Sequence, residues 1–200
     1  MSTVATPRET GALTRQAWTD AATEVLVDRG IDHVRVDVLA KQLGVTRGSF
    51  YWHFRDREDL LRSVLQAWSE SSTAQLTQRL EQARTDPLLQ LRDVLSLPFR
   101  GRAARRAARI ELALRAWARR DDMARAAVDQ SDALRIGYIA QIFSSLGFGI
   151  GQARTRAFLL YGYVVSESVM PNQGGAAQKA ERVRVMEAML TADAQPVTAP

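Results

Sequence analysis

Cysteine is absent from the 200 residues of this chain, and histidine occurs only twice, as His33 and His53. Without cysteine the chain has no disulfides, no thiolate metal sites and no cysteine nucleophile, a composition typical of a reducing cytoplasm. A glycine-rich phosphate loop and the usual spacing of metal ligands are also missing. Residues 166–168 read Ser-Glu-Ser, but no histidine lies near them in the sequence to activate a serine. We therefore predict that the protein is not an enzyme and needs no cofactor and no metal.

Long hydrophobic runs are missing as well. No apolar run approaches the roughly 18 residues that a membrane-spanning helix needs. The first ten residues lack the basic and then apolar pattern of a secretory signal, so we expect a cytoplasmic protein with no membrane partner. Strand-type alternation does not stand out, whereas apolar residues recur at helical spacing, which predicts an all-α fold of about nine helices. The predicted helices cover residues 13–29, 36–43, 47–54, from 56 or 57 onward, 88–97, 103–120, 122–146, 153–170 and 177–192.

The net charge of +5 is unevenly distributed along the chain. Residues 1–62 carry equal numbers of basic and acidic side chains, and the positive surplus lies in the arginine-rich residues 100–120. We interpret that run as a solvated helix face, with a second nucleic-acid surface as the alternative. Between residues 41 and 57 basic side chains outnumber acidic ones, because Asp56 is the only acid there. A local basic face of this kind favours DNA binding more than net charge does.

Residues 39–57, which read LAKQLGVTRGSFYWHFRDR, contain two short helical patterns. In the first, Leu39 and Leu43 share one face. In the second, Phe50 and Phe54 lie four residues apart and share another face. Each pattern therefore predicts a helix that turns its apolar side toward a common core.

A glycine separates these two patterns. Gly44 can adopt the left-handed conformation that ends a helix, and Thr46 can cap the next helix through its hydroxyl. Two helices joined by so short a turn form a helix-turn-helix. On a helical wheel Trp52 lies opposite the phenylalanines, and Tyr51 and His53 lie on the flanks. Large aromatics that point away from a core, among arginines, predict a surface that binds the DNA major groove, with a small aromatic core cluster as the alternative.

The segment LAKQLGVTRGSFYWHF, followed by REDLL at residues 57–61, resembles the TetR/AcrR-like transcriptional regulators. The similarity covers roughly residues 10–62, and residues 110–120 (IELALRAWARR) are similar to a stretch found in one branch of the family. The resemblance implies a homodimer that binds a palindromic operator in double-stranded DNA at the nucleoid, usually as a repressor. It also implies a small-molecule effector, of unknown identity, that binds the C-terminal domain and changes the affinity for DNA.

The resemblance also implies a domain organisation and a set of DNA-binding residues. We expect a disordered arm (residues 1–9), a helix-turn-helix domain (10–55), an effector-binding and dimerisation domain (56–192) and a disordered tail (193–200). The implied DNA-binding residues are Arg35, Thr46, Arg47, Gly48, Ser49, Tyr51, Trp52, His53 and Arg57.

The chemistry of these residues suits the implied roles. Arg47 can reach guanine or a phosphate, and Gly48 allows the backbone to approach DNA closely. Tyr51 and His53 can donate to phosphate oxygens. Relatives often place Ser or Thr at the start of the second helix, where this chain has Val34 and Arg35. Arg35 is the candidate replacement for that phosphate contact, which Asp37 opposes.

The remaining two thirds of the chain give weaker signals. Aromatic residues that are candidates for an effector pocket, with plain core positions as the alternative, are Trp68, Trp117, Tyr138, Phe143 and Tyr161. The segment 153–170 is too apolar for an exposed helix, which favours a four-helix dimer interface with 177–192 over the core of one subunit. The predicted interface residues are Phe158, Tyr161, Val165, Val183, Met186 and Met189. The alternative function is a helical ligand-binding or protein-interaction module that no longer reads DNA.

Overall fold

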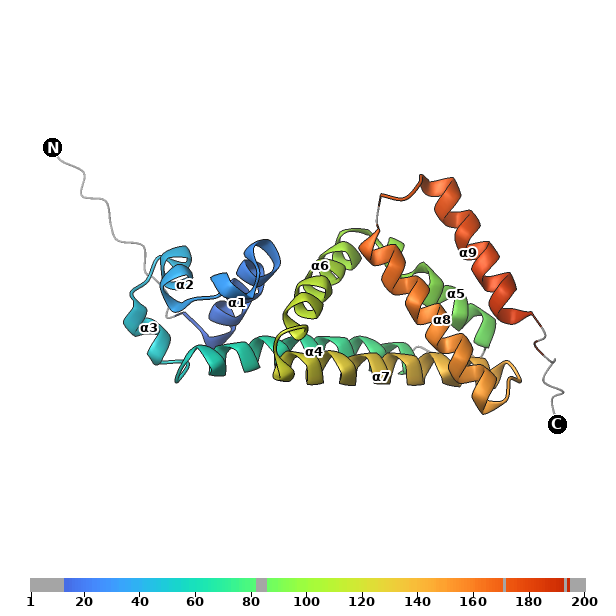
Figure 1. Ribbon diagram of the computed structural model, residues 1–200, viewed down its shortest axis with the longest axis horizontal. Coiled ribbons are helices and arrows are strands. Elements are labelled where there is room, and N and C mark those ends of the chain that lie inside the picture. Colours follow the sequence, from blue (N-terminus) through green and yellow to red (C-terminus); the bar gives the residue numbers. More distant parts are fainter. Residues whose placement is uncertain (1–12, 82–85, 171, 193, 195–200) are drawn as a thin grey trace. The chain divides into compact units, whose positions relative to one another are not determined.

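The computed structural model describes residues 13–81, 86–170, 172–192 and Ala194 (Figure 1). Over these residues the chain forms nine α-helices and two short 3-10 helices, with no strand, which confirms the all-α prediction. The predicted arm (1–9) lies outside the described residues, as does the predicted tail (193–200) apart from Ala194. In the described part of the chain, no helix is both long and apolar enough to cross a membrane.

Contacts divide the chain into two compact units, with the boundary between Ala67 and Trp68. The boundary falls inside one long helix, α4 (Arg57–Glu81). Its first turns belong to the N-terminal unit because Leu60 and Leu61 are buried there. The N-terminal unit further contains α1 (Arg15–Arg29), a 3-10 turn η1 (Ile31–His33), α2 (Val36–Leu43) and α3 (Arg47–Tyr51).

An aromatic cluster forms the centre of the N-terminal unit. Trp18 and Phe50 are completely buried and Phe54 almost so. The Phe50 ring lies 5.3 Å from the Trp18 ring, edge to face, and 5.3 Å from the Phe54 ring. Burying a side chain of this size stabilises the fold by roughly 1.5–3 kcal/mol. The cluster therefore anchors α3 on the bundle through the face that the phenylalanine spacing predicted.

The third helix is shorter than predicted. It ends at Tyr51 rather than at residue 54, and Trp52 and His53 form a turn. The amides of His53 and Phe54 both donate to the Phe50 carbonyl, at 2.9 and 3.0 Å. Because the second of these bonds repeats the geometry of a helical turn, Phe54 still lies beneath Phe50 and reaches the core.

The C-terminal unit contains the rest of α4 and five further α-helices. They are α5 (Pro87–Ser96), α6 (Gly101–Ala118), α7 (Asp122–Ser145), α8 (Ile150–Val169) and α9 (Ala176–Thr191), with a 3-10 turn η2 (Leu97–Phe99) after α5. Asp86 and Asp121 cap α5 and α7, each accepting a backbone N–H at 2.9 Å. Aspartate is a preferred N-cap residue, so both caps can be read from the sequence.

The core of this unit lies where α7 and α8 pack on α5 and α9. Its members include Leu91 of α5, Phe143 of α7, Leu160 of α8 and Leu190 of α9, which are fully or almost fully buried. The core leaves a hollow beside α6, whose surface toward α5 and α8 is made largely of alanine.

Candidate functional site

The turn between α2 and α3 is built by a glycine and by backbone hydrogen bonds. Gly44 has the left-handed backbone (φ 69°, ψ 30°) that the sequence predicted. The Val45 amide donates to the Ala40 carbonyl at 3.0 Å, which closes the end of α2. Thr46 is the N-cap of α3, but its hydroxyl makes no capping bond, so the predicted side-chain cap is wrong. The Ser49 amide donates instead to the Thr46 carbonyl at 3.1 Å.

The outer face of α3 and the following turn is aromatic and exposed. Trp52 is 88% exposed and Tyr51 is 58% exposed, whereas Phe50 between α3 and the core has no exposed surface. Arg47 and Gly48 are exposed at the start of the helix, and Ser49 and His53 are half-buried. The orientation predicted for Trp52 is confirmed. A bulky indole held in solvent has no role in the packing of this unit and is available to a partner.

Gly48 is not required by the fold. A Cβ at this position would meet only the Thr46 hydroxyl, at an ordinary contact distance of 3.6 Å. Its backbone is that of an α-helix, which alanine adopts more readily than glycine. A glycine that costs helix stability and fills no structural need leaves room for something to approach the α3 backbone closely.

Two ionised residues outside the predicted set hold the end of α3 in place. The Arg15 guanidinium lies 4.1 Å from the centre of the Phe54 ring and donates to the His53 carbonyl. It also donates to Asp59 at 3.0 Å. Asp59 in turn accepts the Arg55 amide at 3.1 Å. This hydrogen bond from the Arg55 amide holds the pKa of the Asp59 carboxyl below its ordinary value. Arg15 lowers the pKa further by a smaller amount, and burial acts in the opposite direction.

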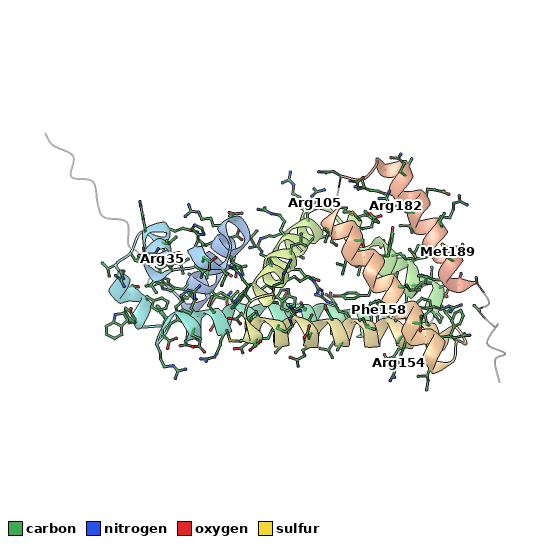
Figure 2. All side chains as sticks on the ribbon, viewed as in Figure 1. Arg35, Arg105, Arg154, Phe158, Arg182 and Met189 are labelled. Atoms are coloured by element: carbon green, nitrogen blue, oxygen red, sulfur yellow. The ribbon has the colours of Figure 1, made fainter. Side chains whose placement is uncertain are left out.

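Arg57 and Arg35 were both predicted to contact phosphate, and both have partners within the chain. The Arg57 guanidinium donates to the carbonyls of Val34 and Ile31, at 2.6 and 2.7 Å. It therefore ties the turn before α2 to the start of α4. Arg35 pairs with Asp37 at 3.2 Å, with both side chains largely exposed (Figure 2). A phosphate contact of Arg35 would have to compete with this pair, so the opposing effect of Asp37 on that contact stays a prediction.

A second candidate site is a cavity of about 360 Å³ in the C-terminal unit. One wall is α6, which contributes Ala103, Ala104, Ala107 and Ala108. The facing walls come from α5, η2, α7 and α8 and are mostly aliphatic, and Ser72 of α4 reaches one end. The alanines occur at helical spacing, so their small side chains line one face of α6 and leave the space unfilled.

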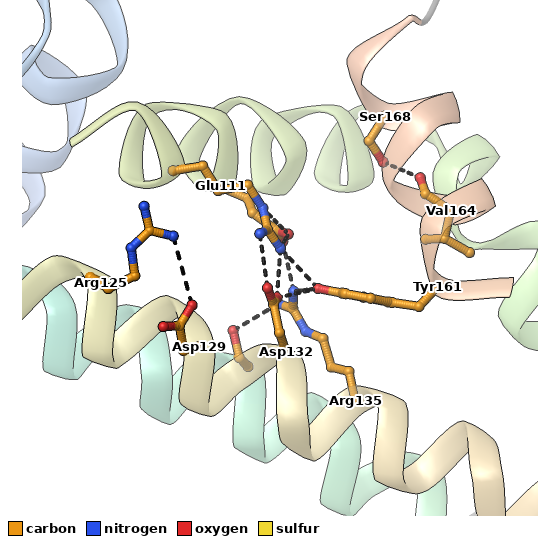
Figure 3. Close-up of polar contacts among 10 residues, drawn as sticks. Glu111, Arg125, Asp129, Asp132, Arg135, Tyr161, Val164 and Ser168 are labelled. Atoms are coloured by element: carbon orange, nitrogen blue, oxygen red, sulfur yellow. Dashed lines mark hydrogen bonds and ion pairs between the residues drawn. The ribbon is translucent and has the colours of Figure 1, made fainter. Parts of the chain in front are cut away.

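One end of the cavity is polar and contains a network of ionised side chains (Figure 3). Arg115 of α6 pairs with Glu111 at 2.7 Å and with Asp132 of α7 at 2.6 Å. Arg135 of α7 pairs with Glu111 at 2.8 Å and donates to Ser72 at 3.2 Å. The Tyr161 hydroxyl of α8 donates to Asp132 at 2.6 Å and accepts from both arginines at 3.0 Å.

Burial and the ion pairs act in opposite directions on this network. Burial disfavours the charged form of Arg115, but its hydrogen bonds to Asp132 and Glu111 outweigh burial and raise the pKa of the guanidinium above its ordinary value. Burial raises the pKa of the Tyr161 hydroxyl, and the nearby Glu111 carboxylate raises it further. The arginines therefore stay charged and the tyrosine stays neutral at the pH values at which proteins are normally folded.

Comparisons with known proteins agree with this architecture. Residues 19–64 match the family of bacterial regulatory proteins described as the tetR family. The HTH-type transcriptional regulator AcrR of Shigella flexneri is 40% identical over 85 residues, which cover 41% of this chain and 38% of AcrR. A transcriptional regulator from Rhodococcus sp. Rha1 superposes with a TM-score of 0.73 at 19% identity, covering 92% of this chain and 100% of that one.

The helix-turn-helix region is TetR/AcrR-like in sequence, and the chain as a whole has the fold of such regulators. FadR of Bacillus subtilis, solved in complex with stearoyl-CoA, has the same fold with a TM-score of 0.63 at 20% identity, covering 88% of this chain and 97% of FadR. This chain spans less than half the length of the curated relatives that it matches in sequence. The sequence similarity is thus confined to the helix-turn-helix and its neighbourhood, whereas the TetR-like fold extends over most of the chain.

The structure brings two of the five predicted effector residues to the cavity of this TetR-like chain. Tyr138 and Tyr161 line it. Trp117 and Phe143 do not, because they are 3% and 0% exposed and belong to the packed interior. Trp68 lies beside the cavity, where its ring centre is 5.7 Å from the Arg135 guanidinium. Trp117 and Phe143 therefore occupy the core positions that the sequence left open as the alternative, since a large aromatic on an apolar face usually fills a core.

Sequence reasoning missed the residues that characterise this cavity. The sequence assigned residues 100–120 to a solvated helix face, and this range includes Glu111, Arg115 and the alanine wall. It gave Arg135 no role. A signal was present, because Glu111 and Arg115 lie four residues apart and the alanines recur with the same spacing. It was ambiguous, because the partners Asp132 and Tyr161 come from other helices.

The predicted dimer residues separate into three groups. Tyr161 and Val165 line the cavity within one chain, and their place in an interface stays a prediction. Val183 and Met186 are half-buried and pack on the core of their own unit. Phe158 and Met189 remain 64% and 67% exposed on α8 and α9 (Figure 2). Their exposed neighbours are Leu159, which is 54% exposed, and Val185, which is 44% exposed.

Proposed function

We propose that this TetR-like chain is a DNA-binding transcriptional regulator, most simply a repressor, whose affinity for its operator changes when a small molecule binds. The observation that carries the proposal is the outer face of α3. Phe50 fastens the helix to the core while Arg47, Gly48, Tyr51 and Trp52 are exposed. A short, rigidly held helix with a cation, a glycine and hydrogen-bonding aromatics on its free face suits the major groove.

We propose a homodimer that binds a palindromic operator. Exposed apolar side chains on α8 and α9, with Phe158 and Met189 most exposed among those predicted, support an interface formed by these two helices. Two identical subunits related by a twofold axis present two copies of α3, and a palindrome presents two identical half-sites. Because such a regulator works on bacterial DNA, a cytoplasmic, nucleoid-associated location is part of the proposal.

The cavity is the proposed effector site. Its volume is within the range of pockets that hold small molecules, and it combines aliphatic walls with a few polar groups. FadR of Bacillus subtilis, which has this fold, was solved with stearoyl-CoA bound. One helix, α4, carries both Ser72, at the end of the cavity, and Asp59, which holds the end of α3 through Arg15. A ligand that moves Ser72 therefore acts on the same helix that positions α3.

DNA binding is tested by fluorescence anisotropy with duplexes from the region upstream of the gene. We expect saturable binding to one palindromic duplex, with affinity that falls steeply as salt rises because phosphate contacts release counterions. Undetectable binding to every duplex, or binding that salt does not weaken, contradicts the proposal and favours a helical module that no longer reads DNA.

The reading face is tested by substitution. Arg47→Ala and Tyr51→Ala each remove one group from the exposed face of α3 without touching the core. Each is expected to weaken operator binding by about 1–3 kcal/mol and to leave the thermal unfolding transition unchanged. Arg29→Ala on α1 is the matched control, since Arg29 is also exposed but lies on another helix. Unchanged affinity in both variants refutes the assignment of α3 as the reading helix.

A further inference from the structure

The ionised side chains at the polar end of the cavity balance one another in number and in contacts. Two cations, Arg115 and Arg135, face two anions, Glu111 and Asp132, and each of the four is paired at 2.6–2.8 Å. The other ionised lining residue, Arg100, pairs with Asp93 at 3.0 Å, and both are at least half exposed. Each ionised lining residue is therefore paired with an opposite charge, and two of the partners, Asp132 and Asp93, are not themselves lining residues.

The tyrosine at the centre of this network is fully committed as well. The Tyr161 hydroxyl gives its hydrogen to Asp132 and receives one N–H from each arginine, so it has no hydrogen left for a ligand. Ser168 likewise gives its hydrogen to the Val164 carbonyl at 2.9 Å (Figure 3). The Ser168 hydroxyl therefore presents only a neutral acceptor oxygen to the cavity.

Apart from Tyr138 and Ser72, the rest of the lining is aliphatic, and it has an opening. The alanines of α6 face Val94 of α5 and Val164 and Val165 of α8 across the cavity. Ala103 and Ala107 are exposed as well as lining it, so the cavity opens to solvent along α6. A small apolar molecule can therefore enter from that side without any helix unfolding.

We infer that the cavity selects an uncharged, largely apolar molecule with few hydrogen-bonding groups, and disfavours carboxylates and ammonium ions of the same size. A charged group that enters the cavity loses its hydration and finds every opposite charge already paired. A neutral molecule loses little hydration and gains contact with the aliphatic walls. The inference deepens the proposed function, because it rests on the cavity being the effector site.

The inference is tested on the full chain, without DNA, by calorimetric titration with three ten-carbon probes: 1-decanol, decanoate and decyltrimethylammonium. We expect 1-decanol to bind at least about tenfold more tightly than either ion, because only the ions have to bury an unpaired charge. Equal or tighter binding of either ion overturns the inference, and so does a failure of all three probes to bind.

Charge-changing variants test whether the network causes the preference. Glu111→Gln leaves the network of Glu111, Arg115, Asp132 and Arg135 with one surplus positive charge, and Arg135→Gln leaves it with one surplus negative charge. We expect the first to raise the affinity for decanoate about tenfold and the second to raise that for decyltrimethylammonium similarly, because each ion then meets an unpaired opposite charge. Circular dichroism checks that each variant is folded. Folded variants with the ion affinities of the parent chain contradict the inference.

The location is tested with a matched pair of tryptophans on α6. Ala107→Trp places an indole at the opening of the cavity, and we expect it to weaken 1-decanol binding at least about tenfold by filling the space. Ala116→Trp is the control, because Ala116 is exposed on the same helix and does not line the cavity. Equal effects of the two variants overturn the cavity as the binding site. If the parent chain binds no operator duplex but still prefers 1-decanol, only the proposed function is overturned.

Discussion

At the scale of single residues, the most informative contrast is between neighbours on α3. Phe50 is fully buried and Trp52, two positions later, is 88% exposed. Residues of the first kind hold the helix on the core, and residues of the second kind can be reached by a partner. Gly48 belongs to the second group, because the fold gives it neither a positive φ nor a crowded neighbour. A substitution at Gly48 can therefore separate stability from DNA binding.

We predict that Gly48→Ala stabilises the protein while it weakens operator binding. An alanine in a helix is favoured over glycine by roughly 0.5–1 kcal/mol, and its Cβ would have only one contact, at 3.6 Å from the Thr46 hydroxyl. The methyl group occupies the space through which DNA is proposed to approach α3. Thermal unfolding measures the first effect and fluorescence anisotropy the second. Stabilisation with full operator affinity would show that DNA does not approach this position closely.

At the scale of secondary-structure elements, α3 is too short to hold its own position. It spans only Arg47–Tyr51, and isolated helices of that length are unstable in water. Its position depends on the aromatic core and on the ionic contacts of Arg15 and Asp59 at the start of α4. Arg57 adds a second tie, from α4 to the turn before α2. The reading face is thus held from behind by residues that do not belong to it.

We predict that Asp59→Asn destabilises the chain by about 1 kcal/mol, because it removes a partly buried ion pair and weakens the cap that the carboxylate provides. The pKa of the Asp59 carboxyl is lowered in the folded chain, so its contribution is present above the ordinary value of 3.8 and is lost as the pH falls below that value. Urea unfolding measured over this acidic range should show a smaller loss of stability in the variant than in the parent chain. Identical pH dependence of the two chains would contradict the assigned role.

The Asp59 variant also tests the link between the clamp and the reading face. With the Arg15 contact weakened, the end of α3 is held less firmly, so operator affinity at neutral pH is expected to fall. Asp37→Asn is the matched control, because Asp37 is an exposed carboxylate whose partner Arg35 is also exposed. That variant is expected to leave stability nearly unchanged, in line with the small worth of exposed ion pairs.

At the scale of the whole molecule, each of the two compact units contains one proposed site. The N-terminal unit carries α3, the C-terminal unit carries the cavity, and α4 contributes residues to both units. The C-terminal unit also exposes apolar side chains on α8 and α9 that its own core does not use. We propose a second copy of the chain as the partner of this surface.

We predict that Phe158→Arg converts the protein from dimer to monomer. Phe158 is 64% exposed in one chain, so the substitution does not disturb the core, but in the proposed dimer it places one arginine from each subunit in the apolar interface. Sedimentation analysis should show the mass of one chain, and operator affinity should fall because two linked half-site contacts become one. Arg154→Ala, an exposed change on the same helix, is the control. An unchanged dimer would exclude this face of α8 from the interface.

The sequence by itself determined the helices and the helix-turn-helix. Signals such as the Asp121 cap, the left-handed Gly44 and the paired Phe50 and Phe54 act within one or two turns of chain, so they can be read without knowing the fold. The same locality explains why α3 was predicted with the correct start and inner face but with an end three residues too late.

Only the tertiary structure decided what depends on several helices at once. The cavity exists because the alanines of α6 face α5 and α8, and its charge balance exists because Asp132, Arg135 and Tyr161 meet Glu111 and Arg115 from other helices. Whether an aromatic lines a cavity, as Tyr138 does, or fills a core, as Phe143 does, depends on the neighbouring helix rather than on its own spacing. Contacts between residues far apart in sequence have no local signal, and they define the proposed effector site.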